Sequence, residues 1–442
     1  MRTLAGMLTL MAGVVAAATV GACGGDDGAG DGDAGTDAAV GPTAAEVFET
    51  TVVRRYELTV SAADWAAINV NPRTEMYVPA ELRYGDTVVA QIGLRYKGSV
   101  GSLALCFDMA GNRTCPKLSM KLKFDEYVAG QRFAGLKRLN FHAMMRDPSL
   151  MKDRLGYALF RAAGVPAPRA AHARLSVNGM DLGLFALVEE IDGEFVEDHF
   201  RSVDGTGEGN LYKEVWPVHT TAQPYLTALE TNETQNPSVD RMIRFAAAIS
   251  AADATTFRAV ANTWMDVPTL VSYLAVDRLI DHWDGIVAWY CPPGGASCFN
   301  HNYFWYEESG RDRVWLLPWD LDNAMMAPSP IRTNYAMPDW NASPTDCAVR
   351  PVFLGYYGRP PACDKLIGLM AQVLWPDYQA RTTELLAGPA APGVMEADIA
   401  AMEALLGPEV ATDRLGPSMA AWQQAVADLR ADLPLLRARV TP

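Results

Sequence analysis

In its first third the chain reads Lys117-Leu118-Ser119-Met120-Lys121-Leu122-Lys123-Phe124. Polar and apolar side chains alternate along this segment, which is typical of a β-strand with one buried face. Two further strand patterns precede it, at 78–84 and 88–96, with a turn at Gly85-Asp86 between them. A Gly- and Ser-rich loop, 97–102, joins them to the lysine-bearing strand. These neighbours predict a β-rich N-terminal region.

The rest of the chain is dominated by helical patterns with two hairpins between them. The hairpins are predicted around the turns Asn178-Gly179 and Ser309-Gly310. The helical patterns lie at 150–163, 241–251, 254–265, 267–282 and roughly 363–442. This order predicts an α+β fold of two lobes, the first β-rich and the second helical, with a cleft where they meet.

The N-terminus has the pattern of an exported protein. An apolar run ends in Val20-Gly21-Ala22-Cys23, which resembles the bacterial lipobox and implies a signal peptide at 1–22 and a lipid on Cys23. Residues 23–46 are rich in Gly, Ala and Asp without Lys or Arg, which predicts a disordered tether. We therefore expect a lipoprotein anchored to the bacterial cell envelope. No other segment is long and apolar enough to span a bilayer.

Cysteine usage agrees with export. Beyond Cys23 the chain has six cysteines in three local couples, and an oxidising compartment favours disulfides between them. A zinc site is the alternative, but no couple has CxxC spacing and few His lie nearby. The predicted disulfides are Cys106–Cys115, Cys291–Cys298 and Cys347–Cys363.

The charge of the chain excludes one class of partner. Its 442 residues carry a net charge of -15, whereas a nucleic-acid-binding protein needs a basic surface. The lysines of the 117–124 strand share one face, which predicts either an anion-binding cleft under the Gly/Ser loop or an ordinary solvated face.

Carboxylates at the ends of apolar segments suggest a metal site. Asp320 and Asp322 flank Leu321, so in an extended segment both point the same way and could bind one Mg²⁺. A capped turn is the simpler interpretation of this pair. Asp284 directly follows an apolar helical pattern, where a helix cap is likewise the simpler interpretation.

Taken together and in order, these segments resemble the CotH family of spore-coat protein kinases and their relatives. The similarity spans about 52–326 and implies an atypical protein-kinase fold over 47–362, followed by a C-terminal helical region over 363–442. The matching pieces are Leu94-Arg95-Tyr96-Lys97-Gly98-Ser99, the 117–124 strand, Leu136-Lys137-Arg138-Leu139-Asn140, Asp153-Arg154-Leu155, Gly164-Val165-Pro166-Ala167-Pro168, Asn178-Gly179, Gly183-Leu184-Phe185-Ala186-Leu187-Val188-Glu189-Glu190-Ile191-Asp192, Gly209-Asn210-Leu211-Tyr212-Lys213, Asp284, Asn302-Tyr303 and Pro318-Trp319-Asp320-Leu321-Asp322.

The resemblance implies transfer of the γ-phosphate of ATP, with Mg²⁺ or Mn²⁺, to Ser or Thr of exported or surface proteins. On the nucleotide side, Lys117 would hold the phosphates, with Lys121 as the second candidate, beneath the loop of Gly98 and Ser99. Glu189 would lie near the nucleotide or serve as a structural hydrogen-bond acceptor. The helix after the lysine-bearing strand offers Asp153 as a partner for Lys117.

On the acceptor side, the resemblance implies that Asp284 orients the hydroxyl and accepts its proton, with Asp281 as a rival. Asp320 would bind the metal, and Asp322 would support it or bind a second ion. Asn302 would help the metal or fix Asp284.

Two other functions remain open from the sequence. A surface binding protein would keep the kinase-like fold without turnover, since ATP is scarce outside the cytoplasm. A metal-dependent glycosyltransferase would use the D-x-D of Asp320 and Asp322 to hold a sugar nucleotide.

Overall fold

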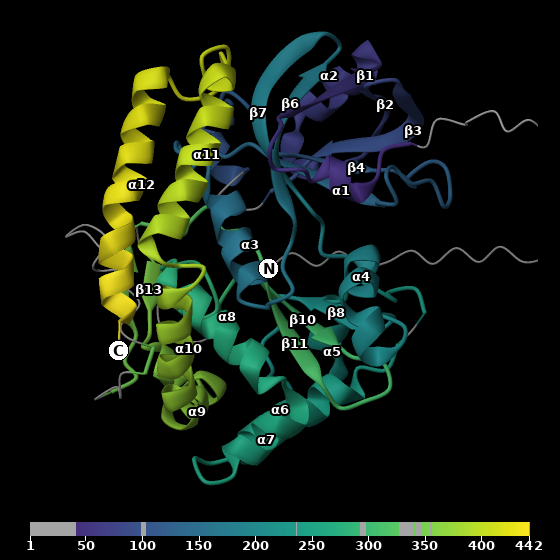
Figure 1. The fold of residues 1–442 in the computed structure, drawn as a ribbon. Helices are drawn as coiled ribbons and strands as arrows, with labels where there is room; N and C mark the ends of the chain where they lie inside the picture. Colours follow the sequence, from purple (N-terminus) through teal and green to yellow (C-terminus); the bar gives the residue numbers. More distant parts are fainter. Residues whose placement is uncertain are drawn as a thin grey trace, which may run out of the picture. The chain divides into compact units, whose positions relative to one another are not determined.

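The lysine-bearing strand belongs to a closed seven-stranded β-barrel in the computed structural model of the protein (Figure 1). The structure describes residues 41–98, 103–235, 237–291, 298–326, 340–341, 346–353 and 356–441. The strands neighbour one another in the order β1-β2-β3-β4-β5-β7-β6, and a parallel pairing of β1 with β6 closes the barrel. Their bounds are β1 Arg54–Val60, β2 Val78–Tyr84, β3 Thr87–Tyr96, β4 Met120–Lys123, β5 Arg138–His142, β6 Ala170–Val177 and β7 Met180–Val188.

Strand register sorts the side chains of β3, β4 and β5 into two faces. Leu94 of β3 and Leu122 of β4 are paired neighbours and fully buried in the barrel core. On the opposite face, Arg95 pairs with Lys121, which in turn pairs with Asn140. The outer face of these three strands therefore presents polar and cationic groups, as the alternation predicts.

A second region of helices and a small sheet follows the barrel. The sheet has the order β11-β10-β8, and its central strand β10 pairs antiparallel with both neighbours. The elements before the C-terminal region are α1 Ala44–Val47, α2 Ala62–Val70, α3 Lys152–Ala162, α4 Gly193–Asp204, β8 Asn210–Lys213, α5 Ala222–Thr227, α6 Asp240–Ala251, α7 Phe257–Trp264, α8 Val267–Leu279, β9 Tyr290–Cys291, β10 Tyr303–Glu307 and β11 Val314–Pro318.

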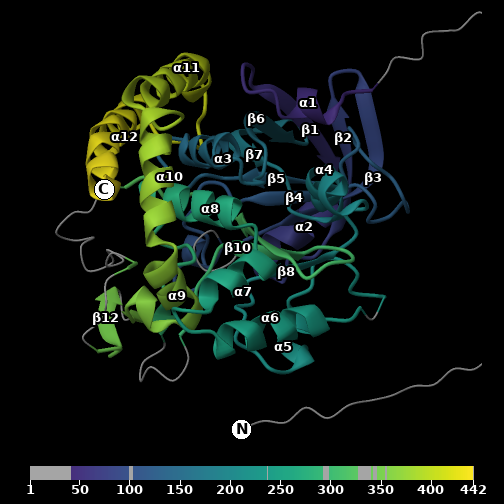
Figure 2. The ribbon, with the colours of Figure 1, turned by 60° about the horizontal axis from the view of Figure 1, so that its bottom comes forward.

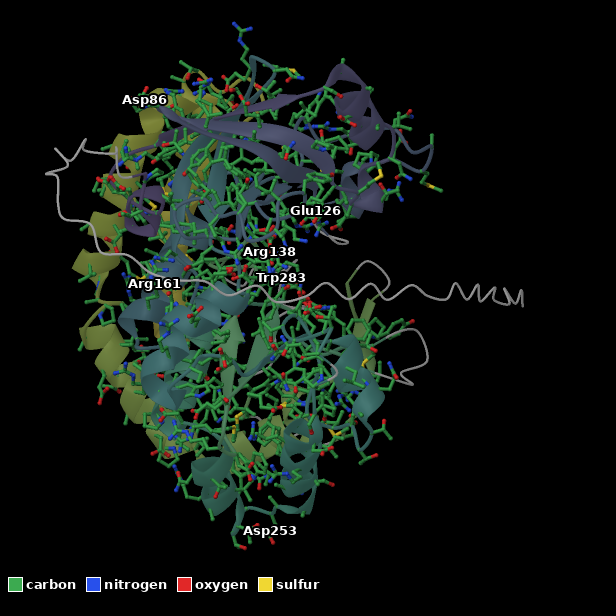
Figure 3. The ribbon with its side chains drawn as sticks, turned by 90° about the vertical axis from the view of Figure 1, so that its right-hand side faces the viewer. Asp86, Glu126, Arg138, Arg161, Asp253 and Trp283 are labelled. Carbon is green, nitrogen blue, oxygen red and sulfur yellow. A yellow bond between two sulfur atoms is a disulfide. The ribbon has the colours of Figure 1, made fainter. Side chains whose placement is uncertain are left out.

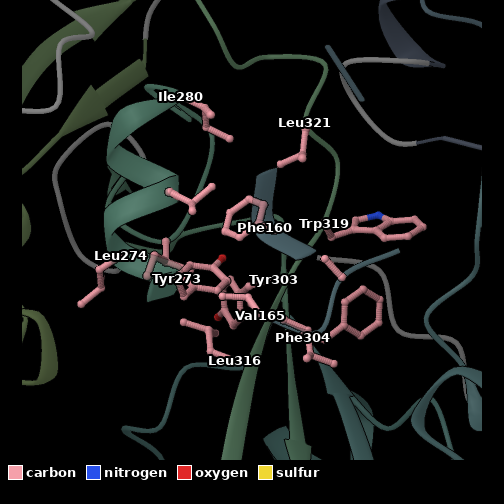
Figure 4. Packing of buried hydrophobic residues seen from close by; sticks show 14 of the residues in the cluster. Phe160, Val165, Tyr273, Leu274, Ile280, Tyr303, Phe304, Leu316, Trp319 and Leu321 are labelled. Carbon is pink, nitrogen blue, oxygen red and sulfur yellow. The ribbon is translucent and has the colours of Figure 1, made fainter. Parts of the chain in front are cut away.

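Each region has its own hydrophobic cluster. One fills the barrel, and the other joins α3, α8, β10, β11 and the C-terminal helices. Figure 4 shows part of the second cluster, where Trp319 and Leu321 lie near Phe160 of α3. The apolar residues that alternate with the acidic pair are thus core residues, because Trp319 is 5% exposed and Leu321 is fully buried. Burial of Trp319 and Leu321 fixes where Asp320 and Asp322 lie.

Four C-terminal helices pack against the rest. They follow β12 Arg350–Phe353 and β13 Tyr356–Gly358, which form a sheet with β9. Helices α10 and α12 both contact α8, and Figure 2 shows α10 beside α8. The loop between α11 and α12 reaches the barrel, where Asp413 accepts a hydrogen bond from the Leu184 N–H at 2.9 Å. The helices are α9 Lys365–Val373, α10 Trp375–Ala387, α11 Pro392–Val410 and α12 Met419–Val440.

Local sequence signals predict local structure well. Asn178 and Gly179 both have positive φ, 52° and 76°, in the turn between β6 and β7, and Gly310 has φ 83° between β10 and β11. All three predicted disulfides are present. The last residues of the predicted tether form α1, with Thr43 and Glu46 as its capping box.

The predictions for the signal peptide, for Cys23 and for Ser99 lie outside the described residues. Within the described ranges, no helix is both long enough and apolar enough to cross a membrane.

Candidate active site

A cavity of about 290 Å³ lies between the outer face of the barrel and the sheet of β8, β10 and β11. Five predicted site residues line it: Gly98, Lys121, Asn302, Asp320 and Asp322. In Figure 3, Arg138 (the first residue of β5) and Trp283 (the neighbour of Asp284) are both labelled where the barrel meets the helical region. The other lining residues are Glu75, Arg95, Lys97, Ser119, His142, Ala143, Met144, Met145, Arg146, Asp153, Glu190, Lys213, Glu214, Glu230, Phe304 and Trp319.

Lys121 is held by Glu190 on the barrel wall of the cavity. Its Nζ donates to Glu190 Oε1 at 2.7 Å, and Asn140 Nδ2 donates to Glu190 Oε2 at 2.6 Å. Burial would raise the pKa of Glu190, but the Lys121 and Lys97 ammonium groups outweigh it and lower that pKa below its ordinary value. Glu190 is therefore a fixed carboxylate that orients Lys121.

Lys97 is the second lysine on this wall, immediately before Gly98, whose φ of 139° favours glycine. Its Nζ lies 3.0 Å from His142 Nε2 and 5.1 Å from the centre of the Trp319 ring. In the part of the chain that the structure describes, no carboxylate comes within salt-bridge distance of this ammonium. Burial lowers the pKa of Lys97 to about 7, although Glu190 opposes the shift. An anion in the cavity would supply its missing counter-charge.

The backbone at Asp320 is fixed in an uncommon conformation. Asp320 has φ 50°, its N–H donates to Tyr157 Oη at 3.0 Å, and its carbonyl accepts from His282 Nε2 at 3.0 Å. The next N–H, of Leu321, donates to Asp153 Oδ1 at 3.3 Å. These contacts from α3 and from the end of α8 hold the segment over the cavity.

Helix α3 approaches this segment closely because it carries Gly156. A Cβ at Gly156 would lie 2.6 Å from Leu321 Cδ1, so a larger residue there would require the Leu321 side chain to move.

Asp322 has surroundings that suit a metal ligand. Its Oδ1 is buried and has no hydrogen-bond partner among the described residues. Burial, followed by the Asp320 and Asp153 carboxylates, raises the pKa of Asp322 well above its ordinary value. Such crowding of carboxylates fits a divalent cation held by oxygen ligands.

A cage formed by the protein alone is absent from the described residues: no three His, Cys, Asp or Glu side chains are grouped as a metal site. Mg²⁺ commonly binds through one or two carboxylates, with phosphate oxygens and water completing its shell. Asp320 and Asp322 fit that pattern.

Asp284 lies in the loop after α8, and Asn302 holds it. Asn302 Nδ2 donates to Asp284 Oδ2 at 3.0 Å and to the Asp284 carbonyl at 3.1 Å. Asn323 Nδ2 is 3.5 Å from the same carboxylate oxygen. Burial raises the pKa of Asp284 above its ordinary value and Asp320 adds to the shift, whereas His301 and His282 oppose it. Of the two predicted roles for Asn302, the structure shows contact with Asp284.

The structure places Lys117 away from the cavity. It precedes β4, is 2% exposed, and donates to the Leu184 carbonyl and to Asp413 Oδ2, the latter at 3.3 Å. Its ammonium also lies 4.8 Å from the centre of the Phe185 ring. These partners already satisfy Lys117, and Lys121 and Lys97 are the lysines that line the cavity.

Three predicted carboxylates have partners other than those that the resemblance implies. Glu189 accepts from the Arg169 N–H at 2.8 Å and pairs with its guanidinium, and it is not among the residues that line the cavity. Asp281 accepts from Arg439 of α12 at 2.8 Å, which ties α8 to the C-terminal helix. Asp153 bonds to His142 rather than to Lys117.

Among the lining residues without a predicted role are Lys97, Glu190, His142 and Glu214. A signal for Lys97 was present, because it is two residues after Arg95 and so shares its strand face. Glu190 adjoins the predicted Glu189. Because β7 ends at Val188, strand periodicity does not indicate which of the two side chains faces the cavity. Glu214 accepts from the Asn302 N–H at 3.0 Å, a contact between distant segments that no local pattern reveals.

Comparison of the chain with known protein families gives a match to one of them. A family model described as CotH kinase protein matches residues 94–431, which includes most of the predicted C-terminal region. Among curated proteins, the inner spore coat protein H of Bacillus subtilis (strain 168) is 23% identical over 199 residues, covering 43% of this chain and 50% of that protein. The inner spore coat protein H-like protein of the same organism is 36% identical over 69 residues, covering 16% and 21%. The chain thus matches half or less of the length of these relatives.

Among solved structures, the crystal structure of a Helicobacter pylori proinflammatory kinase, CtkA, shares 7% sequence identity. The alignment covers 73% of this chain and 94% of that chain with a TM-score of 0.26, too low for an argument about the fold. The family assignment therefore depends on the sequence model, which covers well over half of the chain. The chain belongs to the CotH kinase protein family.

Proposed function

We propose that this protein is a two-lobed protein kinase that transfers the γ-phosphate of ATP to Ser or Thr of exported or surface proteins. The observation that carries this proposal is the charge arrangement of one cavity. Lys97 and Lys121 line its barrel side, while Asp320 and Asp322 line it from the segment that follows β11. Phosphoryl transfer needs cations for the phosphates and carboxylates for a metal.

On the nucleotide side, Lys97 and Lys121 bind the phosphates in place of Lys117. Glu190 keeps Lys121 oriented, and Gly98 lets the chain turn directly beside Lys97. Asp320 and Asp322 would hold Mg²⁺ or Mn²⁺, which when bound neutralises charge on the phosphates. The unpartnered Oδ1 of Asp322 supports this assignment.

On the acceptor side, Asp284 orients the substrate hydroxyl and accepts its proton. The hydroxyl oxygen forms a bond to the γ-phosphorus, the bond from that phosphorus to the bridging oxygen breaks, and ADP leaves. Burial raises the pKa of Asp284, which makes it a better proton acceptor while it is ionised. Asn302 keeps one carboxylate oxygen in place.

The test is transfer of labelled phosphate from ATP to a Ser-rich peptide by the chain that begins after Cys23, with Mg²⁺ or Mn²⁺. We expect incorporation, reduced by about 100-fold or more in Asp284→Asn and Asp320→Asn. Asp86→Asn, on the exposed turn between β2 and β3 and not among the residues that line the cavity, is the matched control and should leave turnover unchanged. Absence of ATP binding by the wild-type protein at millimolar concentration would refute the proposal. Transfer from a sugar nucleotide instead would indicate a glycosyltransferase.

We further propose export and lipid anchoring through Cys23. The three disulfides support an oxidising compartment. Labelled fatty acid should enter the wild-type protein and not Cys23→Ser. Export also favours the second candidate function, a surface binding protein without turnover. That function predicts a folded, membrane-anchored protein in which Asp284→Asn changes neither ligand binding nor phosphate transfer.

A further inference from the structure

A chain of hydrogen bonds runs along one side of the cavity and joins three elements. Lys97, at the end of β3, lies 3.0 Å from His142 Nε2 at the end of β5. His142 Nδ1 lies 3.0 Å from Asp153 Oδ2 in the first turn of α3. The other oxygen of Asp153 accepts the Leu321 N–H at 3.3 Å. The chain therefore connects a cation on the barrel to the backbone between Asp320 and Asp322.

The direction of each hydrogen bond follows from the groups involved. The Asp153 carboxylate accepts, so His142 Nδ1 carries the proton and donates to it. His142 Nε2 is then left with a lone pair, which accepts from the Lys97 ammonium. An ammonium has three donors, and this contact uses one of them. Lys97 is consequently oriented without being neutralised.

The strand register explains why these side chains meet. Lys97 N–H donates to the Ser119 carbonyl at 2.9 Å, which continues the β3–β4 pairing by one residue beyond Tyr96 and Met120. Ser119 Oγ accepts the Ala143 N–H at 2.9 Å, beside His142. Lys97, Ser119 and His142 therefore form a row across three neighbouring segments of the barrel wall.

The two cavity lysines are held in different ways. Lys121 forms an ion pair with Glu190 at 2.7 Å, so its counter-charge is part of the protein. Lys97 instead contacts His142 and the Trp319 ring, and the charged groups that influence it are Glu190, Lys121, Asp320 and Lys213. A flexible lysine side chain without a fixed partner binds phosphate poorly, because orienting it costs entropy each time.

We propose that His142 and Asp153 are positioning residues that hold the Lys97 ammonium ready for a nucleotide phosphate and link it to the metal-binding segment. This inference rests on the proposed function. His142 and Asp153 act through Lys97 and through the Leu321 backbone. Neither touches the substrate in this role. Asp153, on helix α3, thus supports a lysine of the barrel, as the resemblance implies. It does so through His142, and the lysine is Lys97 rather than Lys117.

The test is a double-substitution cycle on the chain that begins after Cys23, with the affinity for ATP measured by calorimetry. Adenosine, a ligand without phosphates, is measured beside it. Lys97→Met and His142→Asn should each weaken ATP binding roughly 10- to 100-fold and leave adenosine binding unchanged. Asn at position 142 can still donate to Asp153 but is too short to reach Lys97. In the Lys97→Met background, His142→Asn should therefore add less than about a twofold loss.

His142→Gln provides the matched rescue, because its longer side chain places an amide oxygen where Nε2 accepts from Lys97. We expect it to keep most of the ATP affinity. Additive losses in the cycle, or equal losses for ATP and adenosine, would overturn the positioning role while leaving kinase activity intact. Failure of the wild-type protein to bind ATP would overturn the proposed function and this inference with it. Thermal unfolding of each variant confirms that it is folded.

Discussion

Two lysines close to the same end of the β3–β4 pair differ in the partners of their ammonium groups. Lys117 is buried, and Asp413, the Leu184 carbonyl and the Phe185 ring surround its ammonium. Lys97 is half-buried and has an imidazole and the Trp319 ring, with no carboxylate at salt-bridge distance among the described residues. The C-terminal hairpin, formed by α11, α12 and the loop between them, neutralises Lys117 through Asp413, so Lys117 serves stability. Lys97 is left for an anion and serves binding.

The difference also assigns a role to the C-terminal helices. The Asp413 loop supplies the counter-charge of Lys117, and Arg174 of β6 bonds to Glu409 at 2.9 Å and to Thr412 at 2.8 Å in the same hairpin. The hairpin therefore covers a side of the barrel away from the cavity. Removing it should expose a buried cation, which makes the C-terminal region part of the folded unit.

The largest effect is expected from Lys97→Met, measured as phosphate transfer. Loss of this cation should lower turnover by about 100-fold or more, because charge on the transferring phosphate is left without one of its two barrel-side partners. Thermal stability should not fall, since the substitution removes a half-buried charge without a carboxylate partner. Normal turnover in this variant would contradict the claim that Lys97, unlike Lys117, binds phosphate.

Lys117→Met should have the opposite profile. It leaves the Asp413 carboxylate buried without its cation, which costs about 3–5 kcal/mol of unfolding free energy. ATP affinity, measured by calorimetry on the folded protein, should stay within about twofold of the wild-type value. The matched control is Lys117→Met/Asp413→Asn, in which removal of the unpaired charge should recover part of the stability. Loss of ATP binding with unchanged stability would contradict this account and show that Lys117 binds the nucleotide.

A smaller effect concerns pH. Because burial lowers the pKa of Lys97 to about 7, this side chain is largely neutral at pH 8 in the free protein. Phosphate favours the ammonium and raises the pKa, so ATP binding should take up a proton at pH 8 and weaken by up to about tenfold per pH unit above 7. Below pH 7 Lys97 is already charged, and its share of this uptake should vanish.

Calorimetry in two buffers with different ionisation enthalpies measures the proton uptake. Lys97→Met is the control, since it should abolish uptake near pH 8 while Glu190 and Lys121 remain. Equal uptake in the variant and the wild-type protein would assign the proton to another group.

The smallest effect is expected at an exposed contact of the same hairpin. Arg55 pairs with Glu409 at 3.1 Å, but its side chain is 63% exposed. Arg55→Ala should change the unfolding free energy by less than about 0.5 kcal/mol, because solvent screens such pairs. A loss comparable to that of Lys117→Met would mean that surface contacts, rather than the buried pair, hold the hairpin in place.

Part of the site was predictable from local sequence. Asp320 and Asp322 both line the cavity, but the extended conformation expected for their segment is not observed, because Asp320 has a left-handed backbone with φ 50° and a turn follows it. The disulfides were predictable because each closes a short loop, with separations of 9, 7 and 16 residues. The strand alternation was correct from Met120 onward, where β4 begins.

The sequence could not predict that a buried carboxylate would neutralise Lys117 and leave Lys97 without one. Lys117 lies before β4, and its carboxylate partner is 296 residues away in the chain. The placement of Glu190 rather than Glu189 at the cavity depends on how the chain leaves β7 after Val188. Both outcomes follow from tertiary contacts, which no pattern within a single segment records.

The most direct test of the central claim is a crystal structure of the protein with a non-hydrolysable ATP analogue and Mg²⁺. We predict the triphosphate against Lys97 and Lys121, the ion between it and the carboxylates of Asp320 and Asp322, and an unchanged pair between Lys117 and Asp413. A triphosphate bound to Lys117, with the Asp413 contact broken, would contradict the account.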